Sequence, residues 1–221
     1  MREYYHSELE EIVNELVIMS DSVQIAVRDA TRSLLEADLT LAERVISGDM
    51  RLDAMHDALE RKSFSLLARQ APVAGELRIL VAAMRMTADL GRMGDLAAHV
   101  AEIARMRYPE HAVPDRLREN FVQMSQIAQD MVAEAGRTLA ERNVAAAEKM
   151  AADDTVMDEL RNTQFRVLLG DDWAEGVEKA VDVALLGRYY ERIADHAVAM
   201  AGRVIYMMTG ELPVGEDWPT T

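Results

Sequence analysis

Two carboxylates, Glu191 and Asp195, lie four residues apart within residues 187–210. On a helix this spacing places both side chains on the same face, one turn apart. Like charges at that distance repel mildly unless a cation lies between them, and paired carboxylate oxygens suit hard divalent or iron-type metals. The alternative is a solvated strip of charge that Arg188 and Arg192 neutralise, and the spacing taken alone favours this alternative.

The segment that carries both carboxylates has the apolar periodicity of a helix. Hydrophobic side chains recur at steps of three and four residues and predict one buried stripe. The stripe consists of Tyr190, Ile193, Ala197, Met200, Val204 and Met207. We therefore expect a single long helix, over residues 173–209, to position the acidic pair.

An internal duplication places a related segment earlier in the chain. Residues 88–104 match the acidic segment at an offset of one hundred positions, which pairs Asp95 with Asp195. Upstream the offset is 105, as in Val27 with Val132, Ala30 with Ala135, Leu34 with Leu139, Glu43 with Glu148 and Asp53 with Asp158. Self-similarity at a fixed period predicts a repeated structural unit of roughly 100 residues.

Composition favours an all-α protein. Half of the 221 residues are apolar, only five are Pro, and helix-forming Ala, Leu, Glu, Arg and Met dominate. The absence of Cys rules out disulfides and thiolate metal sites and is compatible with a reducing cytoplasm. We find no signal segment and no apolar run near the ~20 residues that span a bilayer, so we expect a cytoplasmic protein without membrane insertion. A net charge of −15 opposes nucleic acid as a partner.

Helix-capping and helix-breaking residues along the chain predict six helices in two sets of three. They are expected at residues 3–36 and 39–69, from a first turn at Pro72 to about Arg107, and at about 115–141, 144–169 and 173–209. Asp38 and Asp172 are the expected N-caps of the second and sixth helices. Two prolines between residues 108 and 114 mark the boundary between the repeats. The prediction is two tandem three-helix bundles, residues 1–108 and 114–209, followed by a polar tail at 210–221.

Two motifs resemble the PhoU family of phosphate-uptake regulators. These are RYYERIADHAV at residues 188–198 and QAPVAGELR at residues 70–78. The opening MREYYH and the ending RVIYMMTGELP resemble the actinobacterial branch of the family. The similarity extends from Tyr5 to about Pro213, and the duplicated three-helix plan fits it.

The resemblance implies a regulatory role. PhoU-like proteins are cytoplasmic, often dimeric, and repress the phosphate-starvation response when phosphate is plentiful. The resemblance thus implies a homodimeric adaptor between the ATPase subunit of the high-affinity phosphate importer and a sensor histidine kinase. We expect no enzyme activity, because the sequence contains no Cys nucleophile and no Gly-rich phosphate loop. No anion-binding motif is visible either, so the sequence does not predict direct binding of phosphate.

The resemblance also implies metal ions on acidic faces. The family motif is an acidic residue followed four positions later by Asp, once per repeat, and Fe, Zn, Mn or Mg is the expected metal. Glu191 and Asp195 form the complete motif, whereas Gly91 leaves only Asp95 in the first repeat. Asp89 lies about 200° around the helix from Gly91 and cannot replace it. We therefore expect a weaker metal site in the first repeat.

Carboxylates on the second helix of each repeat extend this prediction. Asp158 and Asp154, with Asp53 in the first repeat, are the further expected metal ligands. A solvated helix face is the alternative. Two other functions also remain open. One is a carboxylate-bridged metal enzyme or metal store, although the chain lacks Glu-x-x-His pairs in matched places. The other is a scaffold whose acidic faces bind nothing.

Overall fold

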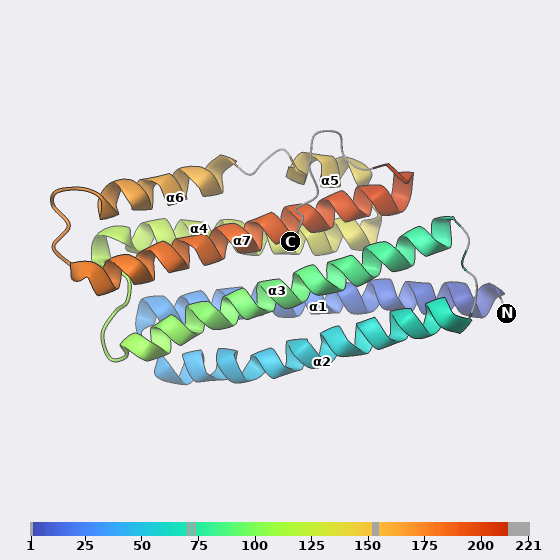
Figure 1. The fold of residues 1–221 in the computed structure, drawn as a ribbon, viewed down its shortest axis with the longest axis horizontal. Helices are drawn as coiled ribbons and strands as arrows, with labels where there is room; N and C mark the ends of the chain where they lie inside the picture. Colours follow the sequence, from blue (N-terminus) through green and yellow to red (C-terminus); the bar gives the residue numbers. More distant parts are fainter. Residues whose placement is uncertain (1, 70–71, 73, 152–154, 212–221) are drawn as a thin grey trace.

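The computed structural model describes residues 2–69, 72, 74–151 and 155–211 (Figure 1). All regular secondary structure in these ranges is α-helical, which confirms the predicted fold class. The helices are α1 (Arg2–Glu36), α2 (Leu39–Arg69), α3 (Gly75–Arg107), α4 (Asp115–Glu141), α5 (Val144–Ala151), α6 (Thr155–Leu168) and α7 (Gly176–Thr209).

The helices form two bundles joined along their lengths. Helices α1, α2 and α3 pack against one another, and α4 to α6 pack against α7. The bundles meet through contacts of α1 with α4 and of α3 with α7. Figure 1 shows α2 along one edge of the molecule and α5 and α6 along the opposite edge. The connection between α3 and α4 coincides with the predicted boundary between the repeats.

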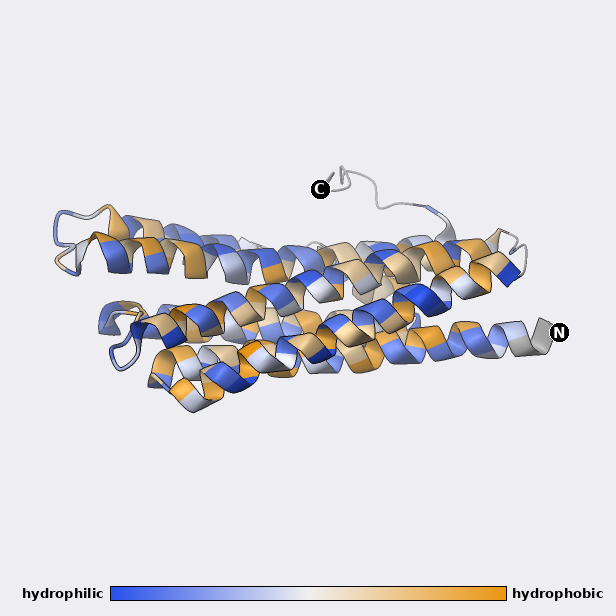
Figure 2. Ribbon diagram, turned by 60° about the horizontal axis from the view of Figure 1, so that its bottom comes forward, coloured by the Kyte–Doolittle hydropathy of each residue, from blue (hydrophilic) through white to orange (hydrophobic). Residues whose placement is uncertain are grey.

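One-sided burial of each helix produces the core. Every residue of the stripe predicted on α7 is buried, and the largest fully buried side chains include Tyr5, Phe121 and Tyr190. Figure 2 shows hydrophobic and hydrophilic segments alternating along each helix, as expected where only one face is covered. Complete burial of a Leu or Phe side chain stabilises the fold by about 1.5–3 kcal/mol, so this stripe fixes the rotation of α7.

Polar contacts tie the two bundles together inside the core. The Thr31 hydroxyl of α1 lies 2.6 Å from the Tyr190 hydroxyl of α7, and Ser125 of α4 donates to Thr31 at 2.8 Å. The Ser20 hydroxyl of α1 donates to the Val132 carbonyl of α4 at 3.0 Å. Because hydrogen-bonded groups at these depths leave few unsatisfied atoms, the contacts favour one packing of the bundles.

Two predicted helix starts have different outcomes. The Asp38 carboxylate accepts a hydrogen bond from the Leu41 amide at 2.9 Å, which confirms it as the N-cap of α2. The prediction for Asp172 was wrong, because α7 begins at Gly176 after Glu175. Asp172 lies in the preceding turn, where its carboxylate accepts a hydrogen bond from Arg116 at 3.1 Å. Its oxygen atoms serve that contact between helices rather than a helix terminus.

One predicted helix is divided in the structure. The sequence predicted a continuous helix over residues 144–169, whereas the structure has α5 and α6 as separate elements. Asp154, an expected metal ligand, falls between them and lies outside the described residues. The predicted polar tail also lies outside them from residue 212 onward.

Candidate functional site: two acidic faces

The acidic motif of the second repeat is held by two arginines. Glu191 of α7 is only 8 % exposed. Its Oε1 accepts a hydrogen bond from Arg161 of α6 at 2.6 Å, and its Oε2 lies 2.6 Å from Nη1 of Arg188. Since both carboxylate oxygens face guanidinium groups, the charge of Glu191 is neutralised locally.

Asp195 and Asp158 lie beside this ion pair and are exposed. Partial desolvation raises the pKa of Asp195, and the negative charges of Glu191 and Asp158 raise it further, whereas Arg188 and His196 lower it. The sequence-predicted ligands Glu191, Asp195 and Asp158 thus lie within electrostatic range of one another. Asp158 lies in the first turn of α6, and α6 packs against α7.

The first repeat collects carboxylates at the equivalent position. Partial burial raises the pKa of Asp49, and the charges of Asp53 and Asp95 raise it further, while His99 lowers it. Asp95 accepts a hydrogen bond from Arg92 at 3.1 Å. Asp53 of α2 and Asp95 of α3, both predicted as ligands, therefore belong to one acidic face.

A different pair replaces the central ion pair in the first repeat. The duplication aligns Gly91 with Glu191 and His56 with Arg161. A Cβ atom placed on Gly91 would lie 3.2 Å from Cδ2 of His56, which is tighter than ordinary packing. The imidazole of His56 therefore lies over Gly91, where the second repeat has a carboxylate and a guanidinium.

The metal prediction stays a prediction. In the part of the chain that the structure describes, no three His, Asp or Glu side chains are arranged to hold a metal ion. The oxygen atoms of Glu191 are engaged by Arg161 and Arg188, so a cation would have to displace both guanidinium groups from them. Metal binding through Glu191 therefore requires Arg161 and Arg188 to adopt a different arrangement.

Sequence reasoning missed the partners that cross between helices. It named Arg188 as a neutralising residue for Glu191 but not Arg161, which is 30 positions away in the chain. It also missed a cluster between the bundles, where the Asp89 carboxylate pairs with Arg203 and lies 3.1 Å from Nδ1 of His196. The helical angle between Asp89 and Gly91 had indicated only that Asp89 faces away from the acidic motif.

These features define a class of protein. The chain is a duplicated helical protein, with one acidic face in each repeat and extensive contacts between the repeats. None of the helices described is both long and apolar enough to cross a membrane.

The chain belongs to the PhoU domain family. The family model matches twice, over residues 16–104 and 121–204, which correspond to the two repeats. A relative in Mycobacterium tuberculosis, phosphate-specific transport system accessory protein PhoU homolog 2, is 44 % identical over 213 residues, covering 96 % of this chain and all of the relative. PhoU homolog 1 of the same species is 41 % identical over 220 residues and is matched over the full length of both chains. The expected actinobacterial resemblance is thereby confirmed.

Solved structures give the same result for the fold. The crystal structure of PhoU from Pseudomonas aeruginosa superimposes with a TM-score of 0.87 at 28 % identity, covering 94 % of this chain and all of the other. PhoU from Streptococcus pneumoniae superimposes with a TM-score of 0.86 at 24 % identity, over 95 % of this chain and 99 % of the other, and supports the fold alone.

Proposed function

We propose that this protein is a cytoplasmic regulator of phosphate uptake that acts by binding other proteins rather than by catalysis. Its partners in this proposal are the ATPase subunit of a phosphate importer and a sensor histidine kinase, which it connects as a homodimer. The observation that carries the proposal is similarity over the whole length of both repeats to phosphate-specific transport system accessory proteins. Both relatives are matched over their full length.

The charge of the protein supports contacts with basic surfaces. The net charge is −15, and carboxylates gather on one face of each repeat. A field of this sign accelerates encounter with positively charged partner surfaces and is screened by salt. We therefore expect complexes with either partner to weaken as ionic strength rises, mainly through slower association.

The proposal includes a metal ion at the acidic face of the second repeat, on the condition that the ion pairs of Glu191 open. The pKa of Asp195 is raised by burial and by Glu191 and Asp158, and this mutual repulsion is the condition that a bound cation would relieve. Binding through these residues requires Arg161 and Arg188 to release Glu191. Metal binding would therefore compete with an ion pair inside the protein.

A deletion strain tests the regulatory role. Loss of the gene should leave phosphate-starvation promoters active in phosphate-rich medium, and a plasmid copy should restore repression. The measurement is a promoter–reporter assay at high and low phosphate. Normal repression in the deletion strain would contradict the proposal, unless a second family member is present, so the strain should lack every member and receive back only this one.

Purified components test the mechanism. The protein should bind the importer ATPase or the sensor kinase in low salt, and the affinity should fall as salt is added. If neither partner binds at low ionic strength, the adaptor mechanism is wrong even where the deletion strain loses repression.

A further inference from the structure

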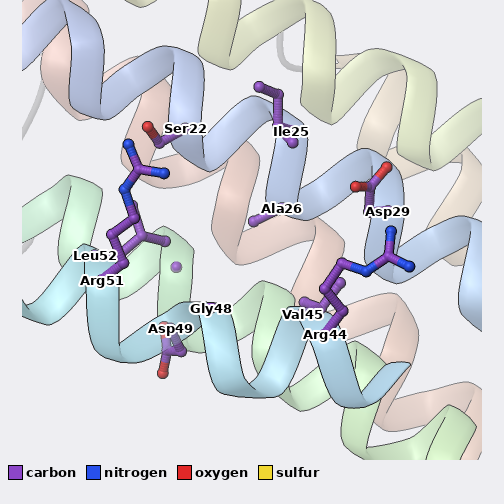
Figure 3. Close-up of a pocket in the computed structure, with 11 residues that line it drawn as sticks. Ser22, Ile25, Ala26, Asp29, Arg44, Val45, Gly48, Asp49, Arg51 and Leu52 are labelled. Carbon is purple, nitrogen blue, oxygen red and sulfur yellow. The ribbon is translucent and has the colours of Figure 1, made fainter. Parts of the chain in front are cut away.

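A groove lies between α1 and α2 in the first repeat, apart from the acidic motif of the second repeat. Its cavity volume is about 290 Å³. The floor is apolar, from Ala26, Val45 and Leu52, and two arginines of α2 flank it. Figure 3 shows Arg51 near Ser22 at one end of the groove and Arg44 near Asp29 at the other, with both side chains extending from α2 toward α1.

The two arginines are uncommitted in a strongly acidic protein. Neither the Arg44 nor the Arg51 guanidinium has an ion-pair partner among the described residues, whereas most other arginines there have one. The neighbouring carboxylates already have their own cations. Asp29 lies 3.0 Å from Arg28, and Glu43 lies 3.6 Å from Arg105. Two unpaired guanidinium groups on one groove are therefore available to an anion from outside the chain.

Gly48 keeps the space between the arginines open. It lies inside the 31-residue helix α2, where Gly costs about 1 kcal/mol relative to Ala. A Cβ atom at Gly48 would meet nothing within 4 Å, so no close packing requires the glycine. Its φ angle is not in the left-handed region either, so the backbone does not require it. The absence of a side chain at Gly48 has a function only if a ligand occupies the groove above it.

Two acidic residues, Asp29 and Asp49, also line the groove. Asp29 is engaged by Arg28, and Figure 3 shows Asp49 pointing away from the groove. The Asp49 carboxylate lies against α3, with Oδ1 3.4 Å from the position of a Cβ on Gly94, and belongs to the acidic face described above. The Ser22 hydroxyl donates to the Ile18 carbonyl at 2.9 Å, so the guanidinium groups are the available donors.

We propose that this groove is a binding site for a small polyphosphate-type anion, a linear ligand with more than one phosphate group. Arg44 and Arg51 are seven residues apart, which is about 10 Å along the helix and nearly the same face. A single orthophosphate is too short to contact both guanidinium groups in extended conformations, whereas a chain of two or three phosphates reaches both. Arginine binds phosphate oxygens in a bidentate manner, and the volume lies near the lower limit of small-molecule sites, roughly 300–1,000 Å³.

The second repeat provides an internal contrast. A groove at the equivalent place is lined by residues that the offset of 105 aligns with the first, including Ile127, Lys149 and Val156. Lys149 replaces Arg44, but Val156 replaces Arg51 and Ile127 replaces Ser22. The second groove is also lined by Arg137, but Arg137 forms an ion pair with Glu134 of the same groove, so Lys149 does not face a second uncommitted cation there that could hold the other end of a linear anion. We therefore expect one bound anion per chain.

Isothermal titration calorimetry with metal-free protein in a chelating, low-salt buffer tests the proposal. The probes are orthophosphate, pyrophosphate, tripolyphosphate, magnesium-free ATP, sulfate and succinate. Tripolyphosphate should bind with a stoichiometry of one and roughly tenfold or more tighter than sulfate or succinate. ATP that binds as tightly as tripolyphosphate would identify a nucleotide as the source of the phosphate chain. Tripolyphosphate binding without ATP binding would identify an inorganic chain.

Variants separate this groove from general charge effects. Arg44→Gln and Arg51→Gln, tested as separate single variants, should each weaken tripolyphosphate binding by roughly tenfold or more, and Gly48→Leu should do so without changing the charge. Arg166→Gln is the matched control. Arg166 is also exposed, and its replacement removes one positive charge at a position away from the groove. The proposal is overturned if wild-type protein binds no probe, if all probes bind equally, or if the groove variants bind as tightly as Arg166→Gln. The result does not depend on the regulatory function proposed above.

Discussion

The two repeats place different charges on the same backbone positions. In the second repeat the acidic motif is complete, but Glu191 is held between Arg161 and Arg188. In the first repeat Gly91 and His56 occupy the matching positions, and Asp49, Asp53 and Asp95 form an acidic face where Arg92 donates a hydrogen bond to Asp95. The repeat whose acidic motif is complete in the sequence thus contains a carboxylate, Glu191, that is neutralised by two arginines.

This difference changes how an acidic motif should be assessed. The number of carboxylates predicts the second repeat as the stronger cation site, because each anionic oxygen adds to the affinity for a hard cation. The arginine contacts of Glu191 lower the expected metal affinity of the second repeat, because a cation must displace two guanidinium groups from Glu191. Which contribution dominates is decided by experiments that change one repeat at a time.

The largest effect is expected from removing Arg161. Arg161→Met keeps the aliphatic stem but leaves Glu191, which is 8 % exposed, with Arg188 as its remaining arginine partner. Breaking a fully buried pair costs about 3–5 kcal/mol, but the Arg161 side chain is 31 % exposed, so we expect a loss of about 1–2 kcal/mol. Urea unfolding with a chelator present measures it.

The matched control is the aligned residue of the first repeat. His56 faces Gly91 rather than a carboxylate, so His56→Met should change the free energy of unfolding by about 0.5 kcal/mol or less. Equal losses in the two variants would show that the ion pair of Glu191 does not distinguish the repeats.

A second prediction compares metal binding at the two faces. Gly91→Glu adds a carboxylate beside Asp95. We expect the affinity of the acidic face of the first repeat for a divalent metal ion to rise by about tenfold. Glu191→Gln with Asp195→Asn should lower metal binding at the second face. Elemental analysis and calorimetry on untagged protein measure both.

Rebuilding the ion pair sharpens that comparison. His56 must shift by a few tenths of an ångström to admit the new side chain, because a Cβ at Gly91 lies 3.2 Å from its ring. Adding His56→Arg to Gly91→Glu recreates the pair of the second repeat and should cancel the gain in affinity. If metal binding is unchanged in every variant, the acidic faces are not cation sites.

Much of the fold was predictable because it depends on local patterns. The apolar stripe of α7 and the N-cap at Asp38 are encoded within a few residues of where they act. The start of α7 was misplaced because an acidic residue in a turn has two possible uses. Asp172 pairs with Arg116 of another helix, and local sequence does not reveal that contact.

The site was only partly predictable because its contacts join distant helices. Spacing identified Glu191 and Asp195 on one face, and the duplication identified Asp158. The contact of Arg161 with Glu191, like the groove between Arg44 and Arg51, depends on how helices are rotated against each other. Periodicity fixes which face of each helix is buried but not which polar groups meet across the remaining surface.

The smallest effect concerns pH and involves an aspartate in each repeat. Burial and neighbouring carboxylates raise the pKa of Asp49 in the first repeat and the pKa of Asp195 in the second. A raised carboxyl pKa means that the folded protein binds the proton more tightly than the unfolded chain does. The resulting stability is present below the unfolded-state pKa, about 3.9, and is lost as pH rises through the folded-state pKa.

Replacing either aspartate with asparagine should therefore stabilise the metal-free protein at neutral pH. We expect about 0.5 kcal/mol for Asp49→Asn, and less for Asp195→Asn because Arg188 and His196 already offset part of the repulsion at Asp195. The gain should disappear at about pH 2.5, where the carboxyl groups are protonated in both the folded and the unfolded states. Urea unfolding of wild type and both variants at the two pH values measures the difference. A gain that is equal at both pH values would mean that packing, rather than charge repulsion, limits the stability of these faces.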